Sequence, residues 1–418
     1  MAGLEDASLG ALLKTVTVVG GGWAGLAAAV RATQLGFKVR LLEAAPQLGG
    51  RARRVMHDGL ALDNGQHILI GAYTSTLGLM KTLGLNTLET LHRQPLDLRF
   101  IDGTGLQLNH WPAPLNVLMG VATAKGWSWR DKWAFLRRAQ AWRNAGFVCE
   151  ASTTVGQLCH GLPTPVMQQL IEPLCVSALN LSSAQASGQV FLRVLKDALL
   201  SGAGSSDTLI PRTDLSQLLP DAALSWLQSH GAEVVLGQRV SELPEGLVLL
   251  ACPAWEAAEL TQRISPNWAM QARSLNHTAI ATVYARCETA LQWPSPMLAL
   301  RQDQNAPAQF AFDKGRLSGT ADLHGVVALV VSDCTLERDA VTAMVLQQAQ
   351  QQLGLSLTWL TTVVEKRATF ACTPGLQRPA MQVAKGVWAC GDHVAGPYPA
   401  TLEGAVRSGY AAAQALMS

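Results

Sequence analysis

VTVVGGGWAG, residues 16–25, is the stretch that decides the fold of this chain. Its first four residues are rich in β-branched side chains and end at glycines, which predicts a buried strand. Gly20, Gly22 and Gly25 then follow in G-x-G-x-x-G spacing. In a nucleotide-binding turn the first glycine allows the tight bend, the second admits a pyrophosphate, and the third lets the next helix pack on the strand.

The residues that follow complete a strand–helix–strand unit. Residues 24–35 are rich in Ala and Leu and contain no proline, and Gly36 stands where a glycine commonly ends a helix. Residues 37–42 predict a second strand, and Glu43 at its end follows Gly25 by 18 residues. This is close to the roughly 20 residues expected before the carboxylate that binds the adenosine ribose. The predicted dinucleotide contacts of this unit come from Gly20, Gly22, Trp23, Ala24, Gly25, Glu43 and Ala44.

Length and composition indicate a two-domain protein with a large core. The chain has 418 residues, of which 49% are hydrophobic and only 15% are charged. Two domains are expected because single cores seldom grow to this size. The formal net charge of +2 favours neither a nucleic acid nor an acidic surface as partner.

The cysteines and the N-terminal residues bear on the expected compartment. The eight cysteines are scattered without a C-x-x-C pair or a histidine spacing suited to zinc, so we predict reduced thiols, no metal site and a cytoplasmic protein. Residues 1–13 contain Glu5 and Asp6 and lack the pattern of a signal peptide. The sequence offers no clean apolar run long enough to span a membrane, so the expected alternatives are a soluble protein and one peripheral at the inner membrane.

A second glycine pair, Gly49-Gly50, followed by Arg51, comes shortly after the predicted ribose carboxylate. A unit that binds NAD does not require this pair, whereas a loop close to a bound cofactor would use it, with Arg51 near phosphate. Together with the N-terminal fingerprint, these residues resemble the flavin-containing amine oxidase and carotenoid desaturase superfamily. The resemblance implies that the chain binds FAD.

Two positions depart from the superfamily pattern. Members usually have Ser or Thr three residues after the arginine, where this chain has Arg54. Most also have glycines at about Thr213-Asp214, in the segment that returns the chain to the cofactor domain.

Further cofactor contacts are implied by the resemblance alone. The turn after Asp63 would cross beside the isoalloxazine ring, the backbone of Val240 would meet the adenine, and Asp392 would hold the ribityl or pyrophosphate region. A closing helix from about Leu402 to Leu416, with Thr401 as a fair N-cap, would aim its N-terminus at the flavin and stabilise negative charge there. Cofactor contacts beyond the first unit are therefore expected from Gly49, Gly50, Arg51, Gly65, Gln66, His67, Val240, Gly391, Asp392, Thr401, Leu402, Glu403 and Ala405.

Two strings, residues 62–67 and residues 171–180, resemble one branch of the superfamily, the bacterial hydroxysqualene dehydroxylases of squalene and hopanoid biosynthesis. The resemblance implies reductive dehydroxylation of hydroxysqualene to squalene, with loss of water and hydride transfer from reduced flavin. An external electron donor is then required. The alternatives are a carotenoid desaturase of the phytoene type, an amine oxidase and a flavin-free prenyl-binding carrier. The intact fingerprint argues against a carrier, and the chain has only 4 tyrosines from which an amine oxidase could build its aromatic cage.

The implied reaction needs a proton donor, and three residues near the predicted flavin are candidates. Asp63 and His67 flank the D-x-G turn, and His393 follows Gly391-Asp392. Burial in an apolar cavity would raise the pKa of Asp63 and keep it protonated, as a general acid requires. Alternatively, Asp63 accepts hydrogen bonds from backbone N–H groups and only holds the turn, which would lower its pKa.

The expected fold class is α/β, with a Rossmann-like FAD-binding domain that is discontinuous in sequence and an inserted substrate domain of mixed α+β structure. The cofactor domain is predicted to comprise residues 14–80, 205–262 and 384–418. The substrate domain is predicted to comprise residues 81–204, which are mainly helical, and residues 263–383.

Tryptophan and basic residues crowd between Trp127 and Arg143. Trp129, Trp133 and Leu136 would share one face of a helix. The sequence is compatible with an interfacial helix on an anionic membrane. It is also compatible with an ordinary amphipathic helix that packs its aromatic face on its own domain, and this second interpretation is slightly favoured.

Overall fold

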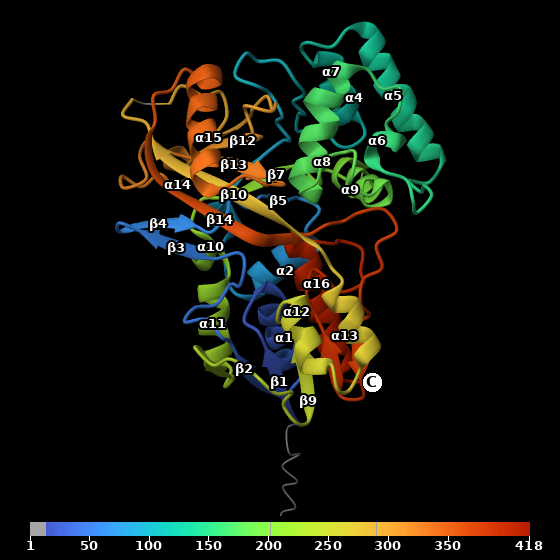
Figure 1. The fold of residues 1–418 in the computed structure, drawn as a ribbon, viewed down its shortest axis with the longest axis vertical. Coiled ribbons are helices and arrows are strands. Elements are labelled where there is room, and N and C mark those ends of the chain that lie inside the picture. The colour runs from blue at the N-terminus through green and yellow to red at the C-terminus, as the bar shows by residue number, and fades with distance from the viewer. Residues whose placement is uncertain (1–13, 201, 290) are drawn as a thin grey trace, which may run out of the picture.

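The computed structural model describes residues 14–200, 202–289 and 291–418. One end of the molecule is built on a six-stranded sheet in the order β15-β16-β9-β1-β2-β8 (Figure 1). Its strands pair in parallel, except that β15 pairs antiparallel with β16. The strands are β1 (Thr15–Val19), β2 (Lys38–Leu42), β8 (Glu233–Val235), β9 (Leu247–Leu250), β15 (Gln382–Ala384) and β16 (Val387–Ala389).

This sheet confirms the α/β class and the Rossmann-like unit. Helix α1 (Trp23–Gln34) follows β1 within one residue of the predicted start, and Gly36 ends it with φ of 86°. Strand β8 ends at Val235, five residues before Val240, whose backbone was expected to meet the adenine. The chain then turns at Gly237, where φ is 71°, and Gln238 N donates to Glu43 O over 2.8 Å.

The closing helix α16 (Leu402–Ala415) packs directly against α1 (Figure 1). A Cβ atom at Gly409 would lie 2.3 Å from Ala24 O, so the two helix backbones touch there. A Cβ atom at Gly404 would similarly collide with Tyr398 O. The glycines at these two positions therefore serve contacts between protein segments.

The other elements of this end surround the sheet or connect it to the rest of the molecule. A hairpin, β3 with β4, and a three-stranded sheet in the order β5-β7-β6 lie between the two ends of the molecule. These elements are α2 (Thr74–Thr82), α10 (Leu215–Leu218), α11 (Pro220–Ser229), α12 (Ala254–Thr261), α13 (Pro266–Arg273), β3 (Arg54–His57), β4 (Leu60–Asp63), β5 (Leu69–Ile70), β6 (Leu91–Gln94) and β7 (Thr208–Pro211).

The two departures from the superfamily pattern meet in this region. Arg54 Nη1 lies 3.1 Å from Asp214 Oδ2, and Asp214 also caps α10 by accepting from Ser216 N and Gln217 N. The arginine on β3 and the aspartate at the helix start thus form one ion pair.

The other end of the molecule contains a five-stranded antiparallel sheet in the order β11-β12-β13-β10-β14. Alternate residues of β13 face opposite sides: Leu329 packs with Val341 and Val345 of α15, whereas Ala328 belongs to the core shared with the helical lobe. The elements are β10 (His277–Arg286), β11 (Met297–Ala299), β12 (Phe310–Asp313), β13 (Val326–Ser332), β14 (Thr358–Phe370), α14 (Lys314–Ser318) and α15 (Arg338–Leu353).

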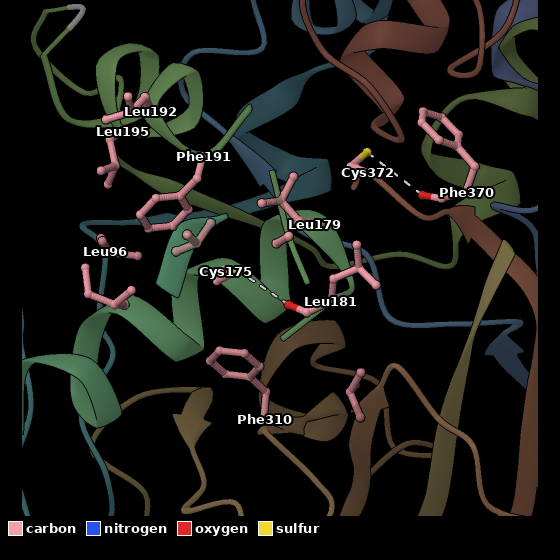
Figure 2. Packing of buried hydrophobic residues seen from close by; sticks show 14 of the residues in the cluster. Leu96, Cys175, Leu179, Leu181, Phe191, Leu192, Leu195, Phe310, Phe370 and Cys372 are labelled. Atoms are coloured by element: carbon pink, nitrogen blue, oxygen red, sulfur yellow. Dashed lines mark hydrogen bonds between the residues drawn. The ribbon is translucent and has the colours of Figure 1, made fainter. Parts of the chain in front are cut away.

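A helical lobe covers the free face of this sheet, and Figure 2 shows Cys175 and Leu179 of α8 packed with Phe191 of α9 and Phe310 of β12. The segment from residue 81 to residue 204 is mainly helical, as predicted. The domain boundaries themselves stay a prediction. The helices are α3 (Thr87–Thr90), α4 (Leu115–Thr123), α5 (Trp129–Asn144), α6 (Val155–Leu158), α7 (Thr164–Val166), the π-helical turn η1 (Met167–Ile171), α8 (Glu172–Leu179) and α9 (Gly188–Leu200).

Helix α5 packs on the lobe with a different face from the one predicted. Trp127, just before the helix, and Phe135 and Trp142 within it are buried, whereas Trp129 and Trp133 are exposed. The favoured interpretation, in which the face of Trp129 and Trp133 packs on its own domain, is therefore wrong. Throughout the part of the chain that the structure describes, we find no helix whose length and apolarity would let it cross a membrane.

The contact between α1 and α16 gives a first prediction. Gly409→Ala should lower the free energy of unfolding by about 1–3 kcal/mol, because the new methyl group meets a backbone carbonyl that has little room to move. Thermal or denaturant unfolding measures the change.

Gly78→Ala is the matched control, because Gly78 lies in α2 and a Cβ atom added there would meet no neighbouring atom within 4 Å. This control should be neutral or stabilising by up to about 1 kcal/mol. Equal effects of the two substitutions would contradict the proposed helix contact.

Candidate cofactor and substrate site

A cavity of about 850 Å³ lies at the carboxyl ends of the parallel strands. Loops after four strands line it: Gly20 after β1, Glu43 after β2, Ala251 after β9 and Gly391 after β16. Ligands of open α/β sheets bind at this edge.

The glycines of the fingerprint allow three close backbone approaches. Gly20 has φ of 107°, and a Cβ atom there would lie 2.8 Å from the backbone of Ala251. A Cβ atom at Gly25 would lie 1.9 Å from Gly20 O, so this glycine packs helix on strand and does not line the cavity. Gly22 forms a parallel bridge with Gly49, which brings the second glycine pair directly beside the first.

The start of α1 offers unpaired donors to the cavity. Its N-cap is Gly22, which has no side chain to accept from the first-turn N–H groups. Trp23 and Ala24, the first helical residues, line the cavity. Free N–H groups and the helix dipole together favour an anion such as a phosphate at this point.

Glu43 is held by two backbone groups at the end of β2. Its Oε2 accepts from Gly21 N at 2.6 Å, and its Oε1 accepts from Ala45 N at 2.7 Å. Each carboxylate oxygen keeps a further lone pair, so both can also accept from the vicinal hydroxyls of a ribose. Ala44 and Val240 line the same cavity.

Arg51 joins the second glycine pair to the closing motif. Its guanidinium lies 2.5 Å from Asp392 Oδ1 and donates to Ala368 O over 2.7 Å. Burial opposes ionisation of Asp392, but the charge of Arg51 and the ring of His393 outweigh it and hold the pKa of this carboxyl below its usual value. Gly50, Arg51, Gly391 and Asp392 all line the cavity.

The two predicted histidines differ in their hydrogen bonds. Nδ1 of His67 lies 2.9 Å from Gly65 O, so this nitrogen carries the proton and Nε2 holds a lone pair. Burial lowers the pKa of His67 and lowers that of His393 to about 4, so both rings are neutral at pH 7. Nε2 of His393 is buried without a hydrogen-bond partner in the described structure, which indicates that a bound group completes this wall.

The surroundings of Asp63 differ from those expected of a general acid in an apolar cavity. Its Oδ1 accepts from Leu215 N at 2.8 Å, and its Oδ2 lies 3.2 Å from Nζ of Lys314. The two side chains are only 1% and 5% exposed, and neither residue lines the large cavity. These contacts are those of the alternative in which Asp63 holds the turn, and its role as an acid stays a prediction.

The start of α16 also faces the cavity. Thr401 accepts from Gly404 N at 2.9 Å, as an N-cap does, and Leu402 and Ala405 line the wall. Glu403, which the resemblance implied as a cofactor contact, turns its carboxylate away from the cavity. The carboxylate accepts from backbone N–H groups of α2 and from Arg407, and it is fully buried.

A second cavity, of about 200 Å³, lies between the helical lobe and the antiparallel sheet. Helices α8 and α9 form one side and strands β10 to β13 form the other. On the sheet side, alternate residues of a strand line the cavity, as Phe310 and Phe312 of β12 do. This alternation is the sequence signal by which they could have been found. Its apolar walls are Ile68, Ile70, Leu96, Leu98, Leu174, Leu179, Val190, Val194, Leu195, Ile280, Met297, Phe310, Phe312 and Val330.

The two cavities meet at a small set of shared residues. Tyr73 is the titratable member of this set, and burial, reinforced by the charge of Glu403, raises the pKa of its phenol well above the usual value. The phenol is therefore a hydrogen-bond donor throughout the physiological range. The residues that line both cavities are Gln66, Ile68, Tyr73, Ser177, Ala178, Ile280, Ser332 and Thr401.

The sequence missed several residues of these walls. Tyr73 lies in a short loop without a motif, and Lys366 and Arg367 come from the long strand β14. Among the described residues, no group of three or more His, Cys, Asp or Glu side chains could hold a metal ion. The uncapped helix start, the ribose acid and the orphaned imidazole nitrogen together fit FAD.

Comparisons with known proteins agree with this geometry. A sequence profile described as "Flavin containing amine oxidoreductase" matches residues 23–417. The chain is 27% identical to hydroxysqualene dehydroxylase of Rhodopseudomonas palustris, over 97% of this chain and 99% of that protein. It is 25% identical to the protein of the same name from Zymomonas mobilis, over 96% of this chain and 98% of that protein.

Two further similarities are more limited. A probable zeta-carotene desaturase of Synechococcus elongatus is 24% identical over 54% of this chain and 51% of its own length. The crystal structure of an oxidoreductase from Methanosarcina mazei has a TM-score of 0.73 at 15% identity, covering 96% of this chain and 99% of the other. At that identity the likeness is one of fold.

The contacts of Glu43 predict its effect on the cofactor. Glu43→Ala removes the carboxylate that we predict to accept from ribose hydroxyls, so FAD binding should weaken by about 1–3 kcal/mol. Equilibrium dialysis or flavin fluorescence measures the dissociation constant.

Glu233→Ala is the matched control, because Glu233 lies on the neighbouring strand β8 and pairs with Arg40 on the surface. It should leave FAD affinity unchanged. Unaltered affinity and flavin content in Glu43→Ala would mean that the ribose site is misassigned.

The buried pair predicts a loss of stability in Asp63→Asn. The amide still accepts from Leu215 N, but Lys314 loses its counter-charge, which should cost about 3–5 kcal/mol of unfolding free energy. Adding Lys314→Met should restore part of this loss, because the double variant buries no unpaired charge. If Asp63 is instead the proton donor, Asp63→Asn keeps its melting temperature and loses roughly 10²–10⁴-fold in turnover.

Proposed function

The chain belongs to the flavin containing amine oxidoreductase family, and from this premise we propose that it is an FAD-dependent hydroxysqualene dehydroxylase. The substrate is hydroxysqualene and the product is squalene. The observation that carries the proposal is similarity along nearly the whole chain to two proteins of that name. The apolar second cavity, which joins the cofactor cavity, supports it.

The chain's own residues account for cofactor binding. Glu43 would hold the adenosine ribose, the start of α1 and Arg51 would hold the diphosphate, and the start of α16 would face the flavin ring. When bound and reduced, FAD supplies a hydride equivalent. An external donor has to provide the electrons for each turnover.

The second cavity suits the hydrocarbon part of a triterpene alcohol. Its walls are mainly aliphatic and aromatic side chains, whose burial against a hydrocarbon is favourable by roughly 25 cal/mol per Å². Gln66, Tyr73 and Thr401 are polar residues that line both cavities, whereas Arg193 and Asp197, which line only the apolar cavity, are paired with each other. The hydroxyl of the substrate therefore belongs at this junction, with the chain extending into the apolar cavity.

Loss of the hydroxyl as water consumes one proton, and the carbon receives one hydride. The phenol of Tyr73 lies at the junction and keeps its proton, so it can hydrogen-bond to the departing oxygen; transfer of the proton leaves a phenolate, which takes up a proton from solvent before the next turnover. His67 faces only the cofactor cavity, and its protonated nitrogen is already bonded to Gly65 O. We therefore add Tyr73 to the predicted donors Asp63, His67 and His393 and rank it first.

The alternatives are less well supported. A carotenoid desaturase needs no polar groups at the junction, and the similar desaturase covers only half of this chain. A carrier without flavin has no use for the ribose acid and the uncapped helix start. We place the enzyme on the cytoplasmic side of the membrane, where all eight cysteines, which are free thiols in the structure, would stay reduced.

Product analysis tests the proposed function. The holoenzyme is reduced with dithionite under anaerobic conditions and incubated with hydroxysqualene, and the oxidised holoenzyme is incubated separately with phytoene. Squalene should form from hydroxysqualene, at no more than one equivalent per flavin. Absence of squalene, together with dehydrogenation of phytoene by the oxidised enzyme, would favour the desaturase.

The position of Tyr73 predicts that Tyr73→Phe lowers turnover roughly 10²–10⁴-fold, with flavin content and melting temperature intact. Tyr398→Phe is the control, because Tyr398 lines only the apolar cavity and should retain turnover. The kcat/KM of the parent should be constant between pH 6 and 9, because the raised pKa keeps the phenol protonated.

A histidine donor would behave differently with pH. Burial lowers the pKa of His67, so the charged ring is lost as pH rises through that value, and kcat/KM would fall over the same range. Such a fall, or normal turnover in Tyr73→Phe, would contradict the assignment of Tyr73.

A further inference from the structure

Large apolar side chains are exposed on two adjacent helices of the helical lobe. Trp129 and Trp133, one turn apart on α5, are 79% and 68% exposed. Lys132 Nζ donates to Ala122 O of α4 over 2.7 Å and lies 5.1 Å from the ring centroid of Trp129, which ties this part of α5 to the end of α4. We call the exposed set the tryptophan patch; it comprises Trp111, Leu115, Leu118, Met119, Trp129 and Trp133.

The residues beneath the tryptophan patch are held by hydrogen bonds and by ring packing. Trp127 Nε1 donates to Gln169 Oε1 over 3.0 Å, and its ring packs edge-on against Phe135 at 5.9 Å between centroids. Ser128 and Asp131 form a capping box at the start of α5. The aromatic side chains that stabilise the lobe are thus different from those exposed on it, and the exposed ones are free for an external contact.

The charge around the patch is strongly positive. Between Asp102 and Glu150 the chain has six lysines and arginines and one acidic residue, whereas the whole chain carries a net charge of only +2. The acid is Asp131, which the capping box already uses. Arg130 and Arg137 are exposed and form no ion pair among the described residues. An apolar surface with exposed cations on the same helix is complementary to an anionic bilayer.

The patch also lies on the outer side of the proposed substrate cavity. Asn116 of α4 donates to Ser206 Oγ over 3.1 Å, and Ser206 lines the apolar cavity. Leu108 N donates to the carbonyl of Leu96, another residue of that wall. A lipid bilayer bound at α4 would therefore be separated from the cavity by only that one helix.

We propose that the tryptophan patch docks the enzyme on the anionic surface of a lipid bilayer. Trp129 and Trp133 sit at the headgroup level, Leu115, Leu118 and Met119 reach the acyl boundary, and the arginines contact anionic lipid. This rests on the proposed function in one respect: the substrate is itself a membrane lipid, and docking brings it to the cavity without passage through water.

Co-sedimentation with vesicles tests the docking. The FAD-loaded protein is mixed with vesicles of phosphatidylcholine and phosphatidylglycerol at low salt, and the bound fraction is measured against lipid concentration. Binding should weaken as salt is raised. The double variant Arg130→Gln/Arg137→Gln should bind about 25-fold more weakly, since each basic residue near such a surface contributes about fivefold. Trp129→Ala/Trp133→Ala should weaken binding by roughly tenfold or more.

Two controls separate the patch from general surface properties. Trp359→Ala removes an exposed tryptophan on β14, and Arg263→Gln removes an exposed cation outside the lobe; both should bind vesicles like the parent. All variants should keep flavin content, melting temperature and turnover of detergent-dispersed hydroxysqualene. Retained vesicle binding in both double variants would overturn the proposal.

The remaining outcomes distinguish docking from the proposed function. Vesicle binding without squalene formation would contradict the function and leave the docking supported. Squalene formation in detergent by a protein that stays in the supernatant would contradict the docking and leave the function supported. A third outcome is that the parent protein does not bind vesicles but forms a dimer in sedimentation velocity, and that the patch variants abolish this dimer. The tryptophan patch would then bind a second copy of this chain, and the proposal fails.

Discussion

Close contact between backbones at glycine is the constraint on which the rest of this structure depends. Gly25 lets α1 start against the turn of β1, and Gly409 lets α16 touch α1. The N-termini of both helices consequently open into one cavity at the carboxyl edge of the sheet. Because each helix start leaves N–H groups unpaired, this arrangement gathers positive electrostatic potential at two ends of a single site. A dinucleotide with a charged centre and an electron-accepting ring matches that distribution.

The second requirement is a fixed relation between the cofactor cavity and the apolar cavity. Lys314 follows β12 of the antiparallel sheet, and its pairing with Asp63 of β4 connects that sheet to the D-x-G turn. Lys314 Nζ also lies 3.3 Å from Oε1 of Gln66, a residue of both cavities. Arg51 makes a similar connection by bonding both Asp392 and the carbonyl of Ala368 in β14. These polar contacts hold the junction at which a hydroxyl group would be oriented.

Local patterns were enough to predict the fold class and the part of the cofactor wall that the first unit forms, whereas the other cofactor contacts were implied by the family resemblance. The strand, glycines and ribose acid of the first unit are close in sequence, so spacing alone indicates their geometry, and the N-cap role of Thr401 follows from its residue type. Long-range packing decided the rest. The pairing of Asp63 with Lys314 spans 251 residues, and Glu403 turns towards α2 because backbone N–H groups there donate to its carboxylate. The exposure of Trp129 and Trp133 depends on which face of α5 meets the lobe, and helical periodicity does not specify that.

The central claim is that reduced cofactor and triterpene alcohol react where the two cavities meet. Anaerobic stopped-flow absorbance near 450 nm measures this most directly, after mixing of dithionite-titrated, fully reduced holoenzyme with hydroxysqualene. The account predicts that the absorbance of oxidised flavin returns in a single turnover and that one squalene forms per flavin. Flavin that stays reduced with hydroxysqualene, under conditions in which oxygen reoxidises it normally, would contradict the account.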